Sequence, residues 1–219
     1  MNAPSQMLVF DMDGVLVDVT DSYRETVVLT VAHFTGQTIS RDLIQDYKNQ
    51  GGWNNDWALS QKICADLGVE VAYGEVVKYF KYLFLDQGLI HRERWLPRNG
   101  LIDRLAVKFE LAIYTGRSRQ EVEITLNREG LLNRFLIVTS DDVEHEKPAP
   151  DGLLKIAALR PGKKLLYVGD TVDDARCSRA ANVPFIGIAA PASPRREQLL
   201  DLLQREGAIQ VLGDINEIC

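Results

Sequence analysis

The stretch MLVFDMDGVLVD at residues 7–18 decides the fold class of this 219-residue chain. Its first four residues are continuously apolar, and an acidic turn that contains a glycine follows them directly. Short apolar runs without polar alternation are typical of strands buried on both faces of a parallel sheet. Four later runs have the same character: FELAIYT at 109–115, FLIVTS at 135–140, KLLYVG at 164–169 and PFIGIAA at 184–190.

Helical patterns of crossover length lie between the later runs, at 118–130, 151–158 and 170–181. This alternation predicts an α/β protein with a Rossmann-like open parallel sheet flanked by helices. Residues 19–97 contain no run of the buried-strand type, and their apolar spacing predicts helices at 21–34, 40–48, 56–67 and 71–86. We therefore expect an α/β core domain made of 1–18 and 98–219 and an inserted α-helical cap domain made of 19–97, with connections near 16–19 and 95–99.

The composition excludes several classes of protein. With 25 Lys and Arg against 31 Asp and Glu, the formal net charge is −6, which argues against binding nucleic acid by general phosphate neutralisation. The cysteines, Cys64, Cys177 and Cys219, are widely spaced and predict neither a disulfide framework nor a zinc cluster. Neither a signal-peptide pattern nor a run of roughly 18 apolar residues occurs. We expect a cytoplasmic protein that binds neither nucleic acid nor membranes.

The residues that follow each apolar run are the candidate site, because ligands bind at the carboxyl ends of the strands in an open parallel sheet. These ends share one edge of the sheet, so the side chains converge there. Most of them are carboxylates, accompanied by one lysine and one Thr-Gly pair. In chain order the candidates are Asp11, Asp13, Thr115, Gly116, Arg117, Asp141, Asp142, Lys147, Asp170, Asp173 and Asp174.

The charges of these candidates predict both a metal and a substrate class. Four or five carboxylates in one cleft repel one another unless a cation neutralises them, and clustered hard oxygen ligands suit Mg²⁺. Lys147, the Thr115 hydroxyl and the backbone N–H of Gly116 together suit the oxygens of a phosphoryl group. The pattern therefore predicts metal-assisted phosphoryl transfer.

The sequence resembles the haloacid dehalogenase superfamily, in the phosphoglycolate phosphatase-like branch that carries a helical cap after the first motif. Four motifs in order carry the resemblance: DxDGVLxD from Asp11, TG from Thr115, KP from Lys147 and GDxxxD from Gly169. The first and last are specific because each follows an apolar strand. Asp11 and Thr115 lie 104 positions apart, which leaves room for the helical insert, and the 32 positions from Thr115 to Lys147 leave room for no second insert.

The resemblance implies a role for each matching residue. Asp11 corresponds to the nucleophile that forms an aspartyl-phosphate. Asp13 corresponds to the acid and base that protonates the leaving alcohol and then activates water. Thr115 and Gly116 correspond to the phosphoryl-binding motif, and Lys147 corresponds to the lysine that pairs with the nucleophile and the phosphate.

The resemblance also implies the metal ligands. Asp11, the main-chain carbonyl of Asp13 and Asp170 correspond to the Mg²⁺ ligands, and Asp174 corresponds to an outer acid of the metal site. The neighbouring Asp173 fits a carboxylate at the start of a helix better than a ligand.

Substrate contacts outside these motifs stay open. Arg117 either reaches the substrate or is a solvated residue of the first helical turn. The run GGWNNDW at 51–57 is either a substrate loop or a packed helix start, in which Trp53 and Trp57 fill the cap core and Asn55 or Asp56 caps the helix. A solvated face is favoured over substrate contact for Lys81, His91, Arg92 and Arg94.

The implied function is Mg²⁺-dependent hydrolysis of a small phosphorylated metabolite by a monomer or homodimer. Phosphoglycolate is one candidate substrate, and histidinol phosphate is another because the cap also resembles a branch associated with histidine biosynthesis. The alternatives are a sugar-phosphate mutase of the β-phosphoglucomutase type and a non-catalytic binding protein on the same fold. Mutases of that type usually carry Glu-Asp where this chain has Gly169-Asp170, and a dehalogenase would lack Asp13.

Overall fold

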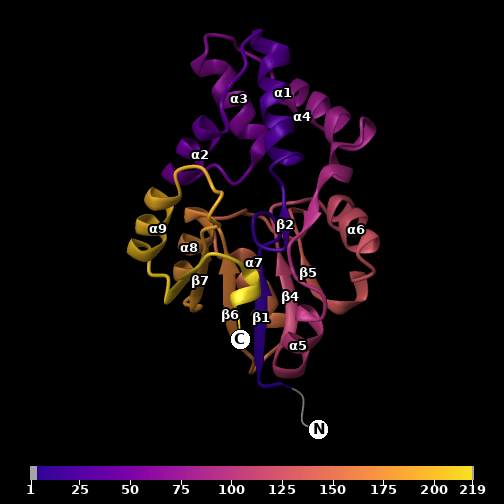
Figure 1. Ribbon diagram of the computed structural model, residues 1–219, viewed down its shortest axis with the longest axis vertical. Helices are drawn as coiled ribbons and strands as arrows, with labels where there is room; N and C mark the ends of the chain where they lie inside the picture. The colour runs from indigo at the N-terminus through magenta and orange to yellow at the C-terminus, as the bar shows by residue number, and fades with distance from the viewer. Residues whose placement is uncertain (1–3, 219) are drawn as a thin grey trace.

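The computed structural model describes residues 4–218, so Cys219 and the first three residues of the expected α/β domain lie outside this range. A six-stranded sheet forms its centre (Figure 1), in the strand order β5-β4-β1-β6-β7-β8. Every neighbouring pair in this sheet is parallel. Starting from β1, the chain adds β4 and β5 on one side of this strand. It then returns to add β6, β7 and β8 on the other side, so the direction of strand addition reverses beside β1. The strands are β1 (Gln6–Phe10), β4 (Glu110–Tyr114), β5 (Leu136–Val138), β6 (Lys164–Gly169), β7 (Phe185–Ile188) and β8 (Gln210–Leu212).

The five predicted strands and the predicted helices are confirmed with shifted ends, whereas β8, α5 and α9 were not predicted. The expected helix at 71–86 divides, because α4 ends at Lys81 and a π-helical turn continues from Tyr82 to Asp86. The helices are α1 (Tyr23–Thr35), α2 (Arg41–Gln50), α3 (Asp56–Asp66), α4 (Tyr73–Lys81), α5 (Leu101–Lys108), α6 (Arg119–Arg128), α7 (Asp151–Leu159), α8 (Val172–Ala180) and α9 (Arg196–Arg205).

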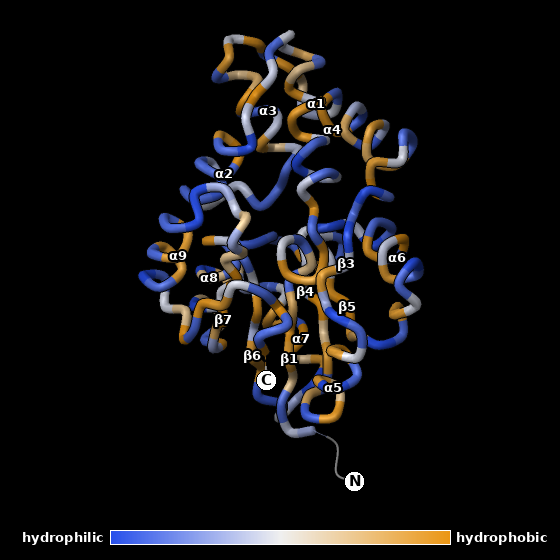
Figure 2. The backbone as a smooth tube through the Cα atoms, in the orientation of Figure 1, coloured by the Kyte–Doolittle hydropathy of each residue, from blue (hydrophilic) through white to orange (hydrophobic). Residues whose placement is uncertain are grey.

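Alternate residues of β1 pack into two apolar layers, one on each face of the sheet. Leu8 and Phe10 belong to the layer that includes α5 and α6, and Met7 and Val9 belong to the layer that includes α7, α8 and α9. All four side chains are fully buried, which explains why this strand lacks polar alternation. Figure 2 shows the same contrast, with apolar colour along the central strands and mixed colour along the helices around them.

Helices α1 to α4, called the helical bundle below, lie together beyond the carboxyl edge of the sheet (Figure 1). The two connections between the bundle and the sheet pair with each other as short antiparallel strands, β2 (Val17–Asp18) and β3 (Arg94–Trp95). Asp18 and Arg94 form an ion pair across this ribbon. Within residues 4–218, none of the helices combines the length and the apolar character needed to cross a bilayer.

Candidate active site

The ends of three neighbouring strands place the central candidates at one edge of the sheet. Asp11 follows β1, Thr115 follows β4 and Asp170 follows β6. All three line a cavity of about 60 Å³ between the sheet and the helical bundle. A water molecule needs roughly 10–15 Å³ on the same measure, so the cavity holds only a few water molecules and suits a small ligand.

Lys147 joins two carboxylates beneath this cavity. Its Nζ donates to Asp11 Oδ1 at 2.8 Å, to Asp174 Oδ1 at 2.7 Å and to the Tyr167 hydroxyl at 3.0 Å. The Lys147 side chain is 1% exposed. Burial by itself lowers the pKa of this lysine, but the charges of Asp11 and Asp174 outweigh burial and raise the pKa well above its ordinary value. Lys147 is therefore held as a cation between the two acids.

The two acids that Lys147 contacts differ in their own electrostatics. Burial raises the pKa of Asp11 to about 7, although Lys147 acts in the opposite direction. Burial also acts to raise the pKa of Asp174, but Lys147, Thr171 and Tyr167 donate to this carboxylate and lower its pKa below the ordinary value. The Asp174 carboxylate is therefore fully ionised at neutral pH and well satisfied by donors.

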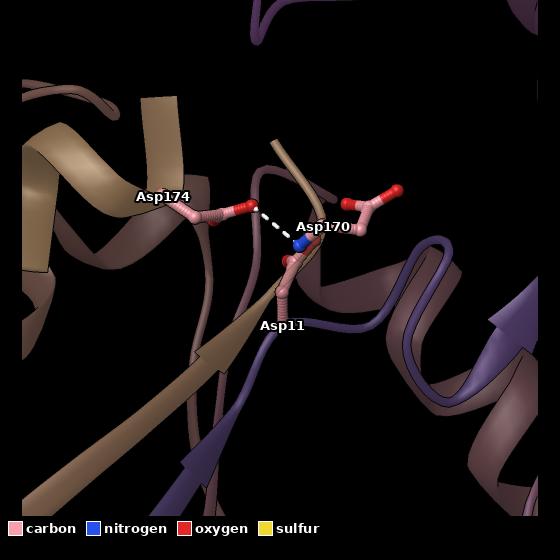
Figure 3. A group of neighbouring side chains, drawn as sticks. All are labelled: Asp11, Asp170 and Asp174. Atoms are coloured by element: carbon pink, nitrogen blue, oxygen red, sulfur yellow. Dashed lines mark hydrogen bonds between the residues drawn. The ribbon is translucent and has the colours of Figure 1, made fainter. Parts of the chain in front are cut away.

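Asp11, Asp170 and Asp174 form a candidate metal centre. Each offers one carboxylate oxygen, and these three atoms lie within 4.8 Å of one another. In Figure 3, Asp174 approaches from α8 and its carboxylate accepts a hydrogen bond of 3.2 Å from the backbone N–H of Asp170. Burial, and then the charges of Asp174 and Asp11, raise the pKa of Asp170 well above its ordinary value. A divalent cation among these oxygens would relieve that repulsion.

A glycine makes room for the Asp170 side chain. Gly14 has φ = +72°, and a Cβ at this position would lie 1.9 Å from Asp170 Oδ2. Any other L-residue would therefore be strained in its backbone and would also collide with the carboxylate. The glycine of the DxDG motif is thus required by both the turn and the candidate metal centre.

The other acids that follow strands have structural partners outside this group. Asp173 Oδ1 accepts from the backbone N–H of Gly52 at 2.7 Å, which ties α8 to the helical bundle. Asp141 Oδ2 accepts from the backbone N–H of Arg119 at 2.7 Å, and Asp142 Oδ2 accepts from Thr139. Among the described residues, both acids of the GDxxxD motif, Asp170 and Asp174, thus join the candidate metal centre, and the intervening Asp173 does not.

Thr115, Gly116 and Arg117 line the cavity from the end of β4. Thr115 is buried, and its Oγ1 accepts from the backbone N–H of Arg117 at 3.2 Å. A Cβ on Gly116 would lie 2.5 Å from Nδ2 of Asn54, a residue of the helical bundle. Gly116 therefore permits the bundle to approach the sheet closely at the cavity.

Arg117 is not solvated, which excludes one of the two alternatives for this residue. Its side chain is 0% exposed and forms ion pairs with both Asp13 and Glu93. The Asp13 carboxylate consequently faces Arg117, and its side chain is not part of the three-acid group. Burial raises the pKa of Asp13, while Arg117 acts to lower it.

The helical bundle and its loops also line the cavity, and three of these residues, Tyr23, Arg24 and Lys48, lie outside the run 51–57 that the sequence singled out. Lys48 Nζ contacts Asp56 Oδ1 at 2.7 Å, and Asn54 Nδ2 donates to Glu146 Oε2 at 3.4 Å. These four residues line the cavity together with Tyr23, Arg24, Asn55 and Trp57. Glu146 directly precedes Lys147 and is the one of these eight that lies outside the segment 19–97. Isolated polar residues within helical patterns carry no local signal for such a role.

The segment 51–57 combines the two alternatives considered for it. Asn55 Oδ1 accepts from the backbone N–H groups of Trp57 and Ala58 at 3.0 Å each, so Asn55 caps α3 as one alternative predicted. Trp53 packs against Tyr47 with a centroid distance of 5.8 Å, whereas Trp57 both packs in the bundle and lines the cavity. Among the described residues, the cavity lining does not include Lys81, His91, Arg92 or Arg94.

The molecule is an α/β protein with an open parallel sheet. At the carboxyl edge of this sheet, carboxylates and a buried lysine surround a small cavity, and together they form a candidate metal-dependent active site. Residues 8–188 match the haloacid dehalogenase-like hydrolase family. The match covers more than half of the chain, and the chain belongs to this family. The resemblance seen in the four motifs is thereby confirmed.

Relatives and solved structures agree with this assignment. An imidazoleglycerol-phosphate dehydratase of Phytophthora nicotianae is 31% identical over 205 residues, which are 87% of this chain but 45% of that protein. This chain therefore spans less than half of that relative. A phosphoglycolate phosphatase of Pseudomonas syringae pv. tomato is 23% identical over 84% of this chain and 69% of its own length. A conserved haloacid dehalogenase-like protein of unknown function from Agrobacterium tumefaciens shares the fold, with a TM-score of 0.77, 22% identity and coverage of 97% and 95% of the two chains.

Proposed function

We propose that this chain is a Mg²⁺-dependent phosphomonoester hydrolase that works through an aspartyl-phosphate on Asp11. The observation that carries the proposal is the meeting of Asp11 and Asp170, which line the cavity, with the buried Asp174, and Lys147 contacts Asp11 and Asp174. A nucleophilic carboxylate beside a fixed cation and a candidate metal centre can approach an anionic phosphoryl group without prohibitive repulsion. The phosphatases among the relatives support the same reaction class.

In this mechanism an Asp11 oxygen attacks phosphorus. The O–P bond of an acyl phosphate forms, and the bond from phosphorus to the leaving alkoxide oxygen breaks. Asp13 gives its proton to the leaving oxygen and later takes a proton from the water that hydrolyses the aspartyl-phosphate. Thr115 Oγ1 and the Gly116 N–H bind the phosphoryl oxygens, and Lys147 keeps Asp11 oriented. Asp11, Asp170 and Asp174 would hold Mg²⁺, which would neutralise charge on the phosphoryl group.

We further propose that residues 19–97 act as a cap that selects the substrate. Lys48, Asn54 and Trp57 of this segment line the same cavity as Asp11, so the leaving part of a substrate would contact them. The small cavity favours a short metabolite. Phosphoglycolate and histidinol phosphate are the two candidates, and they differ in the charge of the leaving part, which is negative in the first and positive in the second.

The experiment that tests the proposal measures phosphate release from a panel of phosphorylated metabolites that includes both candidates, with Mg²⁺ and with EDTA. We expect Mg²⁺-dependent release from one or two compounds, and loss of release in a folded Asp11→Asn variant. Asp141→Asn is the matched control, because Asp141 also follows a strand but does not line the cavity. Retained turnover in Asp11→Asn would contradict the assignment of the nucleophile.

The mutase alternative is less compatible with the space around Asp170. A Cβ on Gly169 would lie 2.5 Å from Asp174 Cβ and Cγ, so the Glu-Asp pair of β-phosphoglucomutase-like proteins would not fit here without movement of Asp174. This contact favours hydrolysis. Product analysis with a hexose phosphate distinguishes the two reactions, since a mutase would return an isomeric hexose phosphate and little free phosphate.

A further inference from the structure

A buried chain of ion pairs leads from Asp13 away from the cavity. Arg117 Nε donates to Asp13 Oδ1 at 2.7 Å, and Arg117 Nη2 lies 2.6 Å from Glu93 Oε1. The side chains of Arg117 and Glu93 are 0% exposed, whereas the Asp13 side chain is 29% exposed. Arg117 borders the cavity as well, but within this chain the ion pair of Arg117 and Glu93 is covered, and Asp13 is the member that exposes side-chain surface there.

Glu93 is itself fixed by α6. Its Oε2 accepts from Thr125 Oγ1 at 2.7 Å and from Arg128 Nη2 at 3.3 Å. Arg117 Nη1 donates to the same Thr125 hydroxyl at 3.1 Å. The guanidinium carbon of Arg117 also lies 5.0 Å from the centroid of the Tyr23 ring. Two nitrogens of Arg117, Nε and Nη1, thus donate hydrogen bonds, and Nη2 lies at ion-pair distance from Asp13 and Glu93 without hydrogen-bond geometry. These contacts hold the planar guanidinium between the two carboxylates.

Two carboxylates and two guanidinium groups balance in this cluster, which is formed by Asp13, Glu93, Arg117 and Arg128. Ion pairs of this kind contribute little net stability, because the loss of hydration offsets the Coulomb attraction. They do fix geometry, since a planar guanidinium binds carboxylates in few orientations. Glu93 directly precedes β3, so the cluster connects Asp13 to the return connection from the helical bundle.

We propose that Glu93 and Arg117 are positioning residues that orient the Asp13 carboxyl group toward the leaving oxygen of a phosphomonoester. The inference rests on the proposed function, in which Asp13 transfers that proton. It assigns to Glu93 a role that none of the four sequence motifs contains, and it gives Arg117 a role through Asp13 rather than through direct contact with the substrate.

The leaving group provides a readout that a merely structural role would not change. Phenyl phosphate and p-nitrophenyl phosphate have similar shapes, but nitrophenolate departs readily without a proton and phenolate needs one. The value of kcat/KM reports steps up to the departure of the leaving group, so it does not include the later hydrolysis of the aspartyl-phosphate. A displaced Asp13 should therefore slow phenyl phosphate selectively.

The first variant is Glu93→Gln, which keeps the size of the side chain but removes its charge. We expect kcat/KM for phenyl phosphate to fall about 10–100-fold, as for partial loss of a general acid, while the value for p-nitrophenyl phosphate falls less than about threefold. The matched control is Glu110→Gln, which also takes a carboxylate from two cations, Arg160 and Lys163, at the opposite end of β4. The control should leave the ratio between the two substrates unchanged.

A second pair of variants keeps the test valid if Glu93→Gln does not fold. Thr125→Val removes the hydroxyl that bonds both Glu93 and Arg117, and we expect the same selective loss at roughly three- to tenfold. Thr125→Ser restores the hydroxyl and should restore the ratio. Equal losses on both substrates, or no loss in folded Glu93→Gln and Thr125→Val, would overturn the inference.

Failure of the inference and failure of the proposed function give different results. If Asp11→Asn is inactive and Asp13→Asn shows the selective loss, but the Glu93 and Thr125 variants do not, then the hydrolase stands and the positioning role falls. If the wild-type protein releases phosphate from no metabolite of the panel and from neither aryl phosphate, or if Asp11→Asn remains active, then the proposed function falls and the positioning role falls with it.

Discussion

Replacing Lys147 with methionine removes a buried charge and keeps most of the side-chain volume. Among the described residues, Lys147 is the cation that contacts both Asp11 and Asp174. Without the positive charge of Lys147, the negative charges of these two carboxylates and of the nearby Asp170 would repel one another. Breaking a buried pair by removal of one partner costs about 3–5 kcal/mol, so we expect the metal-free variant to lose that much unfolding free energy at pH 7.5.

The sign of the pH dependence follows from the direction of the pKa shifts. The raised pKa of Lys147 means that its stabilising contribution is fully present at pH 7.5 and is lost only at much higher pH. The pKa of Asp11 is about 7 even with Lys147 present, and Lys147 acts to lower it. In the variant the folded state therefore binds protons more tightly than the unfolded state does. Its stability should rise as the pH falls from 7.5 to 5.5, and more steeply than that of the wild type.

The assay is urea unfolding followed by far-UV circular dichroism in EDTA at both pH values. Lys62→Met is the control, because Lys62 pairs with Asp66 on the exposed face of α3, with side chains 42% and 41% exposed. Solvent screens such an exposed pair, so its loss should change the unfolding free energy little. The reasoning is refuted if Lys147→Met loses less than about 1 kcal/mol at pH 7.5, or if its deficit does not shrink at pH 5.5.

Two further predictions concern the candidate metal centre and the packing of α7. At a Mg²⁺ concentration of 100 times Kd, the unfolding free energy of the wild type should rise by about 2.7 kcal/mol. The same Mg²⁺ concentration should raise the unfolding free energy of Asp170→Asn by less than about 1 kcal/mol. Equal gains for the two proteins in urea melts would argue against Asp170 as a ligand. Gly152→Ala should destabilise by about 1–3 kcal/mol through overpacking, because its Cβ would lie 2.1 Å from Cε2 of the Tyr114 ring. Helix propensity alone predicts a gain of about 1 kcal/mol, so a higher melting temperature would show that the ring moves aside.

The sheet and the acids at its edge could be predicted because their signals are local. Each buried strand is a short apolar run, and the residue after it is identified by adjacency alone. The carboxyl ends of parallel strands share an edge, so Asp11, Thr115 and Asp170 could be placed near one another without knowledge of any contact. The edge strand β8 was missed because it has three residues and its first, Gln210, is exposed.

The contacts around Arg117 could not be predicted in the same way. Arg117 meets Asp13 across 104 positions of sequence, and Glu93 meets Thr125 across 32. No helical or strand period links such residues. The sequence is therefore compatible with either a substrate contact or a solvated position for Arg117, whereas the structure buries this residue between two carboxylates.

By itself, the sequence determined the α/β class, the positions of five strands along the chain, the helical insert and the acids and lysine that follow the strands. These properties depend on hydrophobic periods and on turns, which a few neighbouring residues specify. Tertiary structure alone decided that the Asp13 side chain faces Arg117 and not the three-acid group, that Lys48 of the helical bundle lines the cavity, and that Arg117 lies between Asp13 and Glu93. These outcomes depend on tertiary contacts between residues that are far apart in the sequence, which form when the helical bundle packs beyond the sheet. Local sequence patterns do not specify such contacts.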